Sequence, residues 1–108
     1  MVRGKLKVIW DEEAKKSLQN IYTYIKQRES KSQAVSVRKK IVELSKSLGS
    51  FPEKFAEEPH LKDEKGNYRS KAIWSYKIIF EVASDSVAIL DIFHTSRDPK
   101  GIDRLVDE

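Results

Sequence analysis

Three consecutive strand-like segments within residues 68–99 constrain the fold of this chain more than any other feature. Polar and apolar side chains alternate along residues 68–74 and 76–83, and residues 87–94 are almost wholly apolar. Alternation with a period of two indicates β-strands, because successive side chains leave a pleated backbone on opposite faces. The short polar segment 84–86 between the second and third strands predicts a β-hairpin.

Two amphipathic helices are predicted before these strands. Asp11 is expected to cap the first helix by accepting a backbone N–H, and the helix is expected to run to about Glu29. The apolar side chains of both helices recur every three or four residues, which places them on one face of each helix. Ser30 or Ser32 is expected to cap the second helix, and Gly49 is expected to end it in the left-handed conformation.

The predicted fold is α+β, with the element order β-α-α-β-β-β. Residues 5–10 supply the first strand, and the short link between the two helices forces them into an antiparallel hairpin. Runs of helices and strands favour a helix hairpin packed on one face of a four-stranded, mainly antiparallel twisted sheet. The strand order stays open, and the other sheet face is expected to be uncovered. Residues 1–108 are expected to form one domain with a partly mobile tail over residues 100–108.

The composition limits the available chemistry. The chain has 108 residues and no cysteine, and its two histidines, His60 and His94, are far apart, so we expect neither a metal nor another cofactor. No phosphate-binding glycine loop or standard hydrolase motif is present. The net charge of +4 favours a polyanionic or acidic partner without requiring one. Because the sequence has neither a long apolar run nor a secretory signal pattern, we expect a cytoplasmic protein without membrane contact.

Basic residues of the strands are candidates for a phosphate-binding face. Arg69 and Lys71 share a face of their strand, Lys77 lies on the next strand, and Arg97 follows the third. With ordinary hairpin registers these four cations are expected to converge on the uncovered sheet face, where they would contact phosphate. The alternative interpretation is that they are solvent-side residues of a one-sided sheet. His94 suits proton transfer, but its alternation favours a structural position on the core side.

Several motifs make this chain similar to a known family. Residues 76–80 (YKIIF) resemble Y-R-[IVL]-[IV]-[YF], and residues 92–99 (IFHTSRDP) resemble I-x-x-H-x-x-R-x-P with one residue fewer before the histidine, both from the RelE/ParE superfamily of type II toxin–antitoxin toxins. Residues 8–10 (VIW) and the pattern L-x-x-F-P at residues 48–52 also fit. The resemblance covers nearly the whole chain. It implies a plasmid stabilisation toxin that uses no cofactor and is bound by a small antitoxin protein.

The superfamily divides by target. RelE-like members are metal-independent, ribosome-dependent mRNA endonucleases (mRNA interferases), whereas ParE-like members inhibit DNA gyrase. Under the RelE-like alternative, the residues that would contact the phosphate or transfer protons are Arg69, Lys71, Lys77, His94 and Arg97. The RelE-type C-terminal tyrosine has no counterpart, because no aromatic residue follows Phe93.

The ParE-like branch is therefore favoured. Two long helices with a basic outer face suit a protein partner, and Arg38, Lys39 and Lys40 are the candidate contacts. The alternative interpretation of these three cations is a solvated helix face. The favoured hypothesis is a toxin that binds and inhibits DNA gyrase. The alternatives are an mRNA interferase that acts on the ribosome with mRNA and an inactive domain that only binds its antitoxin.

Overall fold

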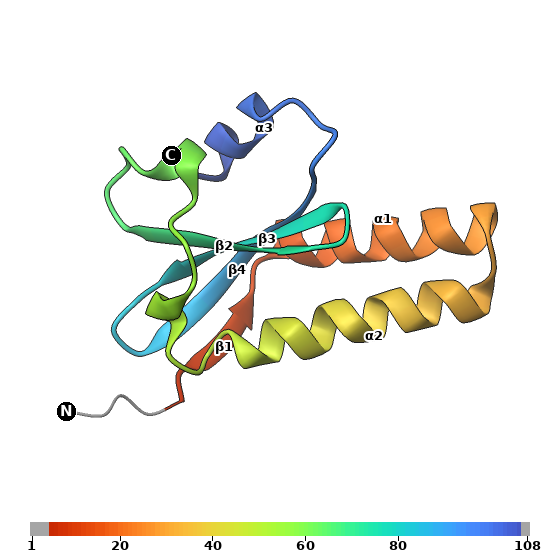
Figure 1. Cartoon of the computed structure of the whole chain (residues 1–108), viewed down its shortest axis with the longest axis horizontal. Coiled ribbons are helices and arrows are strands. Elements are labelled where there is room, and N and C mark those ends of the chain that lie inside the picture. The colour runs from red at the N-terminus through yellow and green to blue at the C-terminus, as the bar shows by residue number, and fades with distance from the viewer. Residues whose placement is uncertain (1–4, 107–108) are drawn as a thin grey trace.

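The computed structural model describes residues 5–106 and shows a helix hairpin followed by a strand meander (Figure 1). The strands and helices, in chain order, are β1 (Lys7–Trp10), α1 (Glu12–Arg28), α2 (Lys31–Ser47), β2 (Asn67–Ile73), β3 (Tyr76–Val82), β4 (Ser86–His94) and α3 (Lys100–Asp103). The three short 3-10 turns are η1 (Pro52–Lys54), η2 (Pro59–Leu61) and η3 (Arg104–Val106). The predicted β-α-α-β-β-β order is confirmed, and α3 is added after it.

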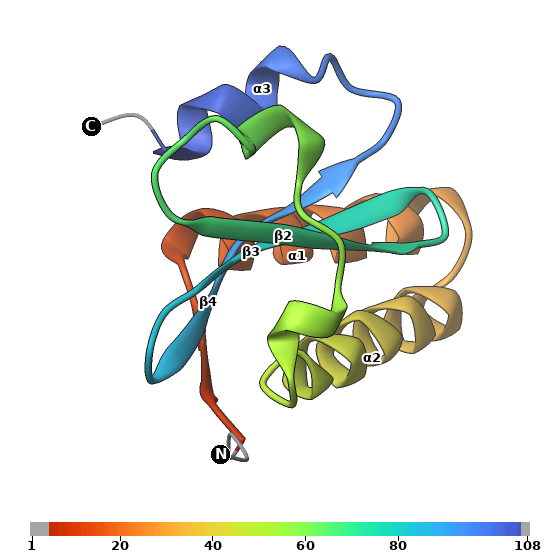
Figure 2. The same cartoon turned by 60° about the vertical axis from the view of Figure 1, so that its left-hand side comes forward.

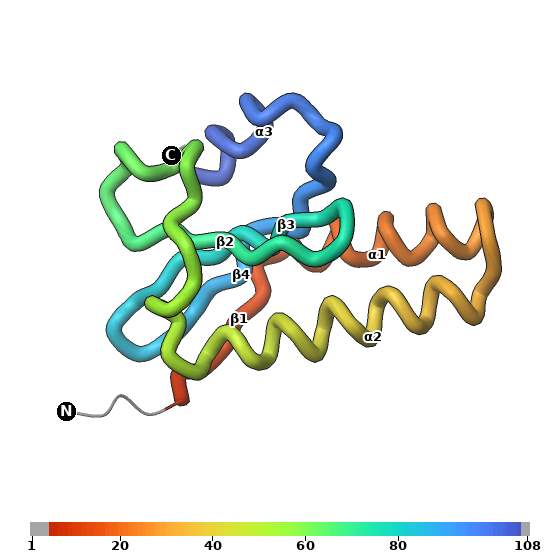
Figure 3. The backbone as a smooth tube through the Cα atoms, viewed as in Figure 1, coloured from red at the N-terminus to blue at the C-terminus, as the bar shows by residue number. Residues whose placement is uncertain are grey.

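The four described strands form one sheet in the order β1-β4-β3-β2. β1 is parallel to β4, and the other two neighbouring pairs are antiparallel, which confirms a mainly antiparallel sheet. The α1–α2 hairpin is the long crossover that a parallel pair needs, since parallel strands cannot be joined by a tight turn. The tube in Figure 3 follows this path from β1 through both helices and back to the sheet.

The main core lies between the helix hairpin and one face of the sheet. Ala14, Ala34 and Ile41 of the helices are fully buried against Ile78 and Phe80 of β3. Burying a side chain of the size of isoleucine or phenylalanine stabilises the fold by about 1.5–3 kcal/mol. The predicted packing of the hairpin on one sheet face is therefore confirmed, and the apolar faces of both helices are buried against that sheet face.

The opposite sheet face is also covered, so the prediction of a bare face was wrong. Leu61 of η2 and Ile102 of α3 are buried against Ile79 and Phe93, which form a second, smaller apolar cluster. Figure 2 shows α3 and α2 on opposite sides of the sheet. The reason lies in the strands, because β3 and β4 are apolar on both faces and both faces need burial. Partial mobility of the tail stays a prediction, and its last two residues lie outside the described residues.

The ends of the helices only partly follow the expected capping. Ser30 accepts a hydrogen bond from the backbone N–H of Gln33 at 3.0 Å, as predicted. Asp11 occupies the N-cap position of α1, but its side chain makes no capping hydrogen bond. Gly49 does not have a positive φ, so its predicted left-handed role was wrong. A Cβ at this position would lie 2.4 Å from the carbonyl oxygen of Leu6, and glycine is needed for that close approach.

The β2–β3 hairpin turns through Trp74 and Ser75. Trp74 was expected to end the strand, but it has a positive φ of 53° and is 61% exposed. A left-handed conformation costs a bulky residue about 1–2 kcal/mol. The limits of β2, β3 and β4 otherwise agree with the predicted strands to within one residue.

Candidate functional site

The predicted convergence of four cations on one surface is wrong. In the β2–β3 ladder, Arg69 pairs with Phe80 and Lys71 pairs with Ile78, so both cations lie on the face that carries the helix hairpin. Lys77 is one residue away from Ile78 and therefore lies on the opposite face. Alternation within a strand shows which of its residues share a face. It does not show which face of a neighbouring strand they join, because that depends on the pairing register, which cannot be read from the sequence.

Arg69 holds an irregular loop against β2. Its Nε donates to Oδ1 of Asn67 at 2.9 Å, and its Nη1 donates to the carbonyl oxygens of Glu53 at 3.2 Å and Phe55 at 2.5 Å. These carbonyls belong to a segment without regular backbone pairing, and the guanidinium supplies the donors they need. Arg69 therefore has a structural role, while Lys71 is exposed on the same strand.

Lys77 is the counter-ion of a buried glutamate that the sequence analysis did not single out. Its Nζ lies 2.8 Å from Oε1 of Glu58, whose side chain is fully buried, and Oε2 of Glu58 accepts the N–H of His60 at 3.0 Å. Burial raises the pKa of the Glu58 carboxyl, but the hydrogen bonds from Lys77 and His60 outweigh burial and lower this pKa overall. Nothing in the sequence distinguishes Glu58 from the other acids of its loop.

His94 and Arg97 are the two predicted site residues that the fold brings together. They line one cavity of about 470 Å³ between α1 and the adjacent ends of β3 and β4, which we call the α1–β4 cavity. Its lining residues are Ser17, Asn20, Ile21, Tyr24, Tyr76, Ile92, His94, Ser96 and Arg97. His94 pairs with Tyr76 on the hairpin side of the sheet, and the two rings meet edge to face at 5.2 Å. Alternation alone did not predict this position, because a register shift between Ile79 and Phe80 puts Leu90 on the opposite face.

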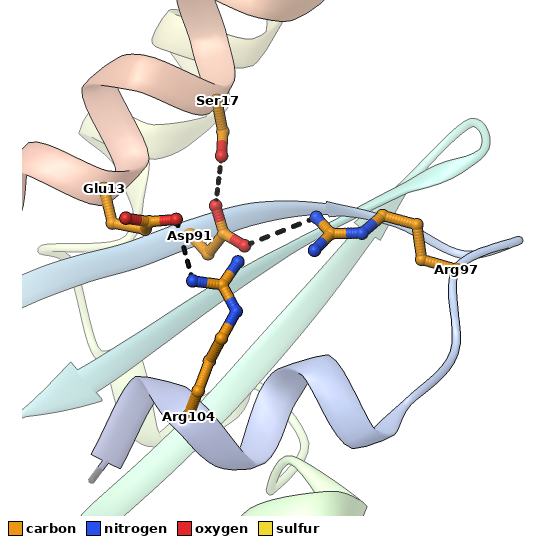
Figure 4. Close-up of polar contacts among 5 residues, drawn as sticks. All are labelled: Glu13, Ser17, Asp91, Arg97 and Arg104. Atoms are coloured by element: carbon orange, nitrogen blue, oxygen red, sulfur yellow. Dashed lines mark hydrogen bonds and ion pairs between the residues drawn. The ribbon is translucent and has the colours of Figure 1, made fainter.

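A buried aspartate, Asp91, forms a long ion pair with Arg97. Asp91 is fully buried, and its Oδ1 accepts a hydrogen bond from the hydroxyl of Ser17. Its Oδ2 lies 4.0 Å from Nη1 of Arg97 and has no hydrogen-bond partner in the part of the chain that the structure describes (Figure 4). The Arg97 guanidinium also lies 4.6 Å from the centre of the Phe93 ring. The sequence analysis missed Asp91, although a lone acid within an apolar strand is a usable signal of a buried, paired charge.

A second ion pair ties the C-terminal segment to α1 beside this site. Nη1 of Arg104 lies 2.9 Å from Oε2 of Glu13 (Figure 4). The hydrogen bond from Arg104 lowers the pKa of the Glu13 carboxyl. Both side chains are nearly half exposed, so the pair contributes about 0–1 kcal/mol to stability. Its main effect is to hold η3 next to the start of α1.

The candidate partner contacts lie elsewhere. The guanidinium of Arg38 sits 4.3 Å from the centre of the Tyr22 ring, and Lys39 and Lys40 are exposed on α2. None of these three cations lines the α1–β4 cavity. Within residues 5–106, no group of histidine or acidic side chains is placed to hold a metal ion, and no helix is long and apolar enough to cross a bilayer.

Comparison with known proteins identifies the family. The model of the ParE toxin of the type II toxin–antitoxin system parDE matches residues 8–99. The chain belongs to this ParE toxin family. It is thus a ParE-like toxin of a type II toxin–antitoxin module, as the sequence motifs indicated.

A solved structure supports the fold of this ParE-family chain. The chromosomal ParDE system from P. aeruginosa contains a chain that superposes with a TM-score of 0.71 at 23% sequence identity. The match covers 83% of this chain and 96% of the other. At this identity the likeness shows the shared fold. Comparison with curated proteins gave no match.

Proposed function

We propose that this ParE-family toxin binds and inhibits DNA gyrase, and that a cognate antitoxin protein neutralises it. Family membership over residues 8–99 carries the proposal, because gyrase inhibition is the activity of the ParE-like branch. The toxin acts by binding, and no bond of a substrate is broken.

The positions of the basic residues favour binding over RNA cleavage. An RNA-cleaving site needs cations aimed at one scissile phosphate, where charge develops in the transition state. Arg69 donates to backbone carbonyls, and Lys77 neutralises the buried Glu58 on the other sheet face. Of the five residues proposed for an interferase, two are committed to internal partners. This arrangement supports the gyrase hypothesis over the RelE-like alternative.

The helix hairpin is the proposed contact surface for gyrase. It extends beyond the sheet (Figure 3). Residues 12–47 contain nine Lys or Arg residues and four Glu residues, a net charge of +5, whereas the whole chain carries +4. The positive charge of the molecule is thus concentrated on the hairpin, which favours encounter with an acidic protein surface. Lys39 and Lys40, which are exposed on α2, are the contacts to test first.

A supercoiling assay with purified gyrase and purified toxin tests this proposal. We expect the wild-type toxin to inhibit supercoiling and the double variant Lys39→Glu/Lys40→Glu to need at least about tenfold more protein, since each contact reverses its charge. Lys62→Glu/Lys65→Glu is the matched control, because it makes the same charge change at two exposed loop positions. We expect this control to inhibit as the wild type does.

Two further measurements separate the alternatives. Induced expression should arrest growth, and co-expression of the antitoxin encoded beside the toxin should restore it. Cleavage of mRNA on added ribosomes, without any effect on supercoiling, would replace the gyrase proposal by the interferase. Growth that continues unchanged on expression would indicate an inactive, antitoxin-binding domain.

A further inference from the structure

We propose that the α1–β4 cavity binds a nucleoside monophosphate. The inference is independent of gyrase inhibition, because a toxin that binds no nucleotide can still bind gyrase through its helix hairpin. It rests on the size of the cavity, the charge of its lining, the donors that His94 and Arg97 present, and the two tyrosines beside them.

The size of the cavity excludes a simple anion as its natural occupant. Its volume of about 470 Å³ falls within the range of about 300–1,000 Å³ that is typical of small-molecule sites. An inorganic phosphate would fill only a small part of this space. The cavity is formed by α1, the ends of β3 and β4, and the segment after β4, so its walls come from four parts of the chain.

The charge of the lining selects an anionic ligand. Among the lining residues within 5–106, Arg97 is the one with a permanent charge, and none carries a carboxylate. Asp91, which is 4.0 Å from Arg97, is fully buried and already accepts a hydrogen bond from Ser17. A cation in this cavity would be repelled by Arg97 and would find no carboxylate among the described lining residues, whereas a phosphate would form charge-assisted hydrogen bonds with the guanidinium.

Asp91 orients Arg97 without occupying its hydrogen-bond donors. The 4.0 Å separation of Asp91 Oδ2 and Arg97 Nη1 is too long for a hydrogen bond, and no other described residue donates to Oδ2. The buried negative charge therefore attracts the guanidinium, while the Arg97 side chain stays 44% exposed. The Phe93 ring, 4.6 Å from the guanidinium, also restrains it. An arginine positioned in this way is prepared for a planar, two-pronged contact with phosphate oxygens.

His94 supplies a second donor. Its Nδ1 accepts the backbone N–H of Ser96 at 3.1 Å and lies 2.7 Å from the Ser96 hydroxyl. Because Nδ1 is an acceptor, the proton of the neutral ring is on Nε2. His94 therefore offers an N–H to a ligand oxygen, and it does so from a side chain that lines the same cavity as Arg97.

The aromatic part of the lining selects a ligand with a flat ring. Tyr24 and Tyr76 both line the cavity, and Tyr24 is 57% exposed although it is a large aromatic side chain. Stacking of a nucleobase on an aromatic ring contributes about 1–3 kcal/mol and requires no particular base. The amide of Asn20, on the same side of α1, offers both a donor and an acceptor to the base or sugar. In a nucleoside monophosphate, the phosphate would contact Arg97, the sugar would meet the polar side chains, and the base would stack on a tyrosine.

Isothermal titration calorimetry with AMP, adenosine and inorganic phosphate tests the inference on the whole chain. We expect AMP to bind, and adenosine and inorganic phosphate each to bind at least about tenfold more weakly, since each lacks one half of the recognised group. Arg97→Met should weaken AMP binding by about tenfold or more, because a hydrogen-bonded charge is lost. Lys62→Met removes the same charge at an exposed loop position outside the cavity and should leave AMP affinity unchanged.

Arg97→Met removes the counter-ion of the buried Asp91 and can disturb folding there, so Tyr24→Ala serves as a second, independent variant. Tyr24 is largely exposed, so this variant should fold as the wild type does and bind AMP at least about fivefold more weakly. NMR signals of the His94 ring should shift on addition of AMP. The inference is overturned if AMP does not bind at millimolar concentration, if inorganic phosphate binds as tightly as AMP, or if Arg97→Met and Tyr24→Ala both bind AMP with wild-type affinity.

Discussion

Replacing Lys77 by methionine should destabilise this protein strongly at neutral pH. Methionine keeps most of the length and apolar contact of the lysine stem but removes the ammonium group that lies 2.8 Å from Oε1 of Glu58. Glu58 would then be a fully buried carboxylate without its counter-ion. Breaking a buried ion pair by removing one partner costs about 3–5 kcal/mol, because the remaining charge is uncompensated.

Two features of the structure reduce this cost. The Lys77 side chain is 20% exposed, so water partly screens the pair, and the His60 N–H still donates to Glu58 Oε2. We therefore expect Lys77→Met to lower the free energy of unfolding by about 2–3 kcal/mol at pH 7. Urea unfolding followed by tryptophan fluorescence and circular dichroism measures this difference. The control is Lys71→Met, an identical change at an exposed position, which should stay within about 0.5 kcal/mol of the wild type.

The pH dependence identifies Glu58 as the cause. In the wild type the pKa of Glu58 is lowered below its ordinary value of 4.5, so its ionisation stabilises the fold above that pH, and this contribution is lost as the pH falls. In Lys77→Met, burial without a counter-ion raises the pKa of Glu58, so protonation removes the penalty as the pH falls. The loss of stability caused by Lys77→Met should therefore be largest at pH 7 and shrink towards pH 4.

The double variant Lys77→Met/Glu58→Gln removes the buried charge and should recover most of the lost stability at pH 7. A loss below about 1 kcal/mol in Lys77→Met, or a loss that is the same at pH 4 and pH 7, would refute this reasoning. It would also reopen a role for Lys77 in contacting phosphate, because a lysine that contributes little to stability is available for a ligand.

Three further substitutions test other parts of the fold by urea unfolding. Arg69→Met should cost about 1–3 kcal/mol, because the loop carbonyls lose their donor, and a loss below 0.5 kcal/mol would contradict this structural role. Gly49→Ala should cost about 1–3 kcal/mol, since its Cβ would lie 2.4 Å from the Leu6 carbonyl oxygen, whereas Gly101→Ala meets its nearest neighbour at 3.4 Å and should cost nothing. Trp74→Asn should stabilise the protein by about 0.5–1 kcal/mol, because asparagine tolerates the positive φ better, and a destabilised variant would show that the exposed indole makes stabilising contacts.

Much of the fold follows from local patterns in the chain. The period of the apolar residues in α1 and α2 predicts two helices with one buried face, and the alternation in residues 68–94 predicts three strands. The position of Ser30 before α2 predicts its cap. These features depend on residues that are close in sequence, where periodicity and propensity act directly.

The candidate site was only partly predictable, because its contacts join distant segments. Asp91 meets Ser17 across 74 residues of chain, and Glu13 meets Arg104 across 91. Sequence motifs selected His94 and Arg97, which do share a cavity, whereas the buried Asp91 beside Arg97 belongs to none of these motifs and was missed. They also selected Lys77 and Arg69, but Lys77 pairs with the buried Glu58 and Arg69 donates to loop carbonyls, so both have structural roles.

Local patterning of the chain was enough to specify the helices, the strands and the motifs that place this protein among the ParE toxins. Strand pairing was needed to assign side chains to faces, since a shift of one residue in register moves every side chain to the other side of a sheet. The turn through Trp74 and Ser75 sets that register for β2 and β3, and it separates Arg69 from Lys77. The second core under α3 has the same origin, because apolar residues on both faces of β3 and β4 require burial, which the folded C-terminal segment and η2 supply.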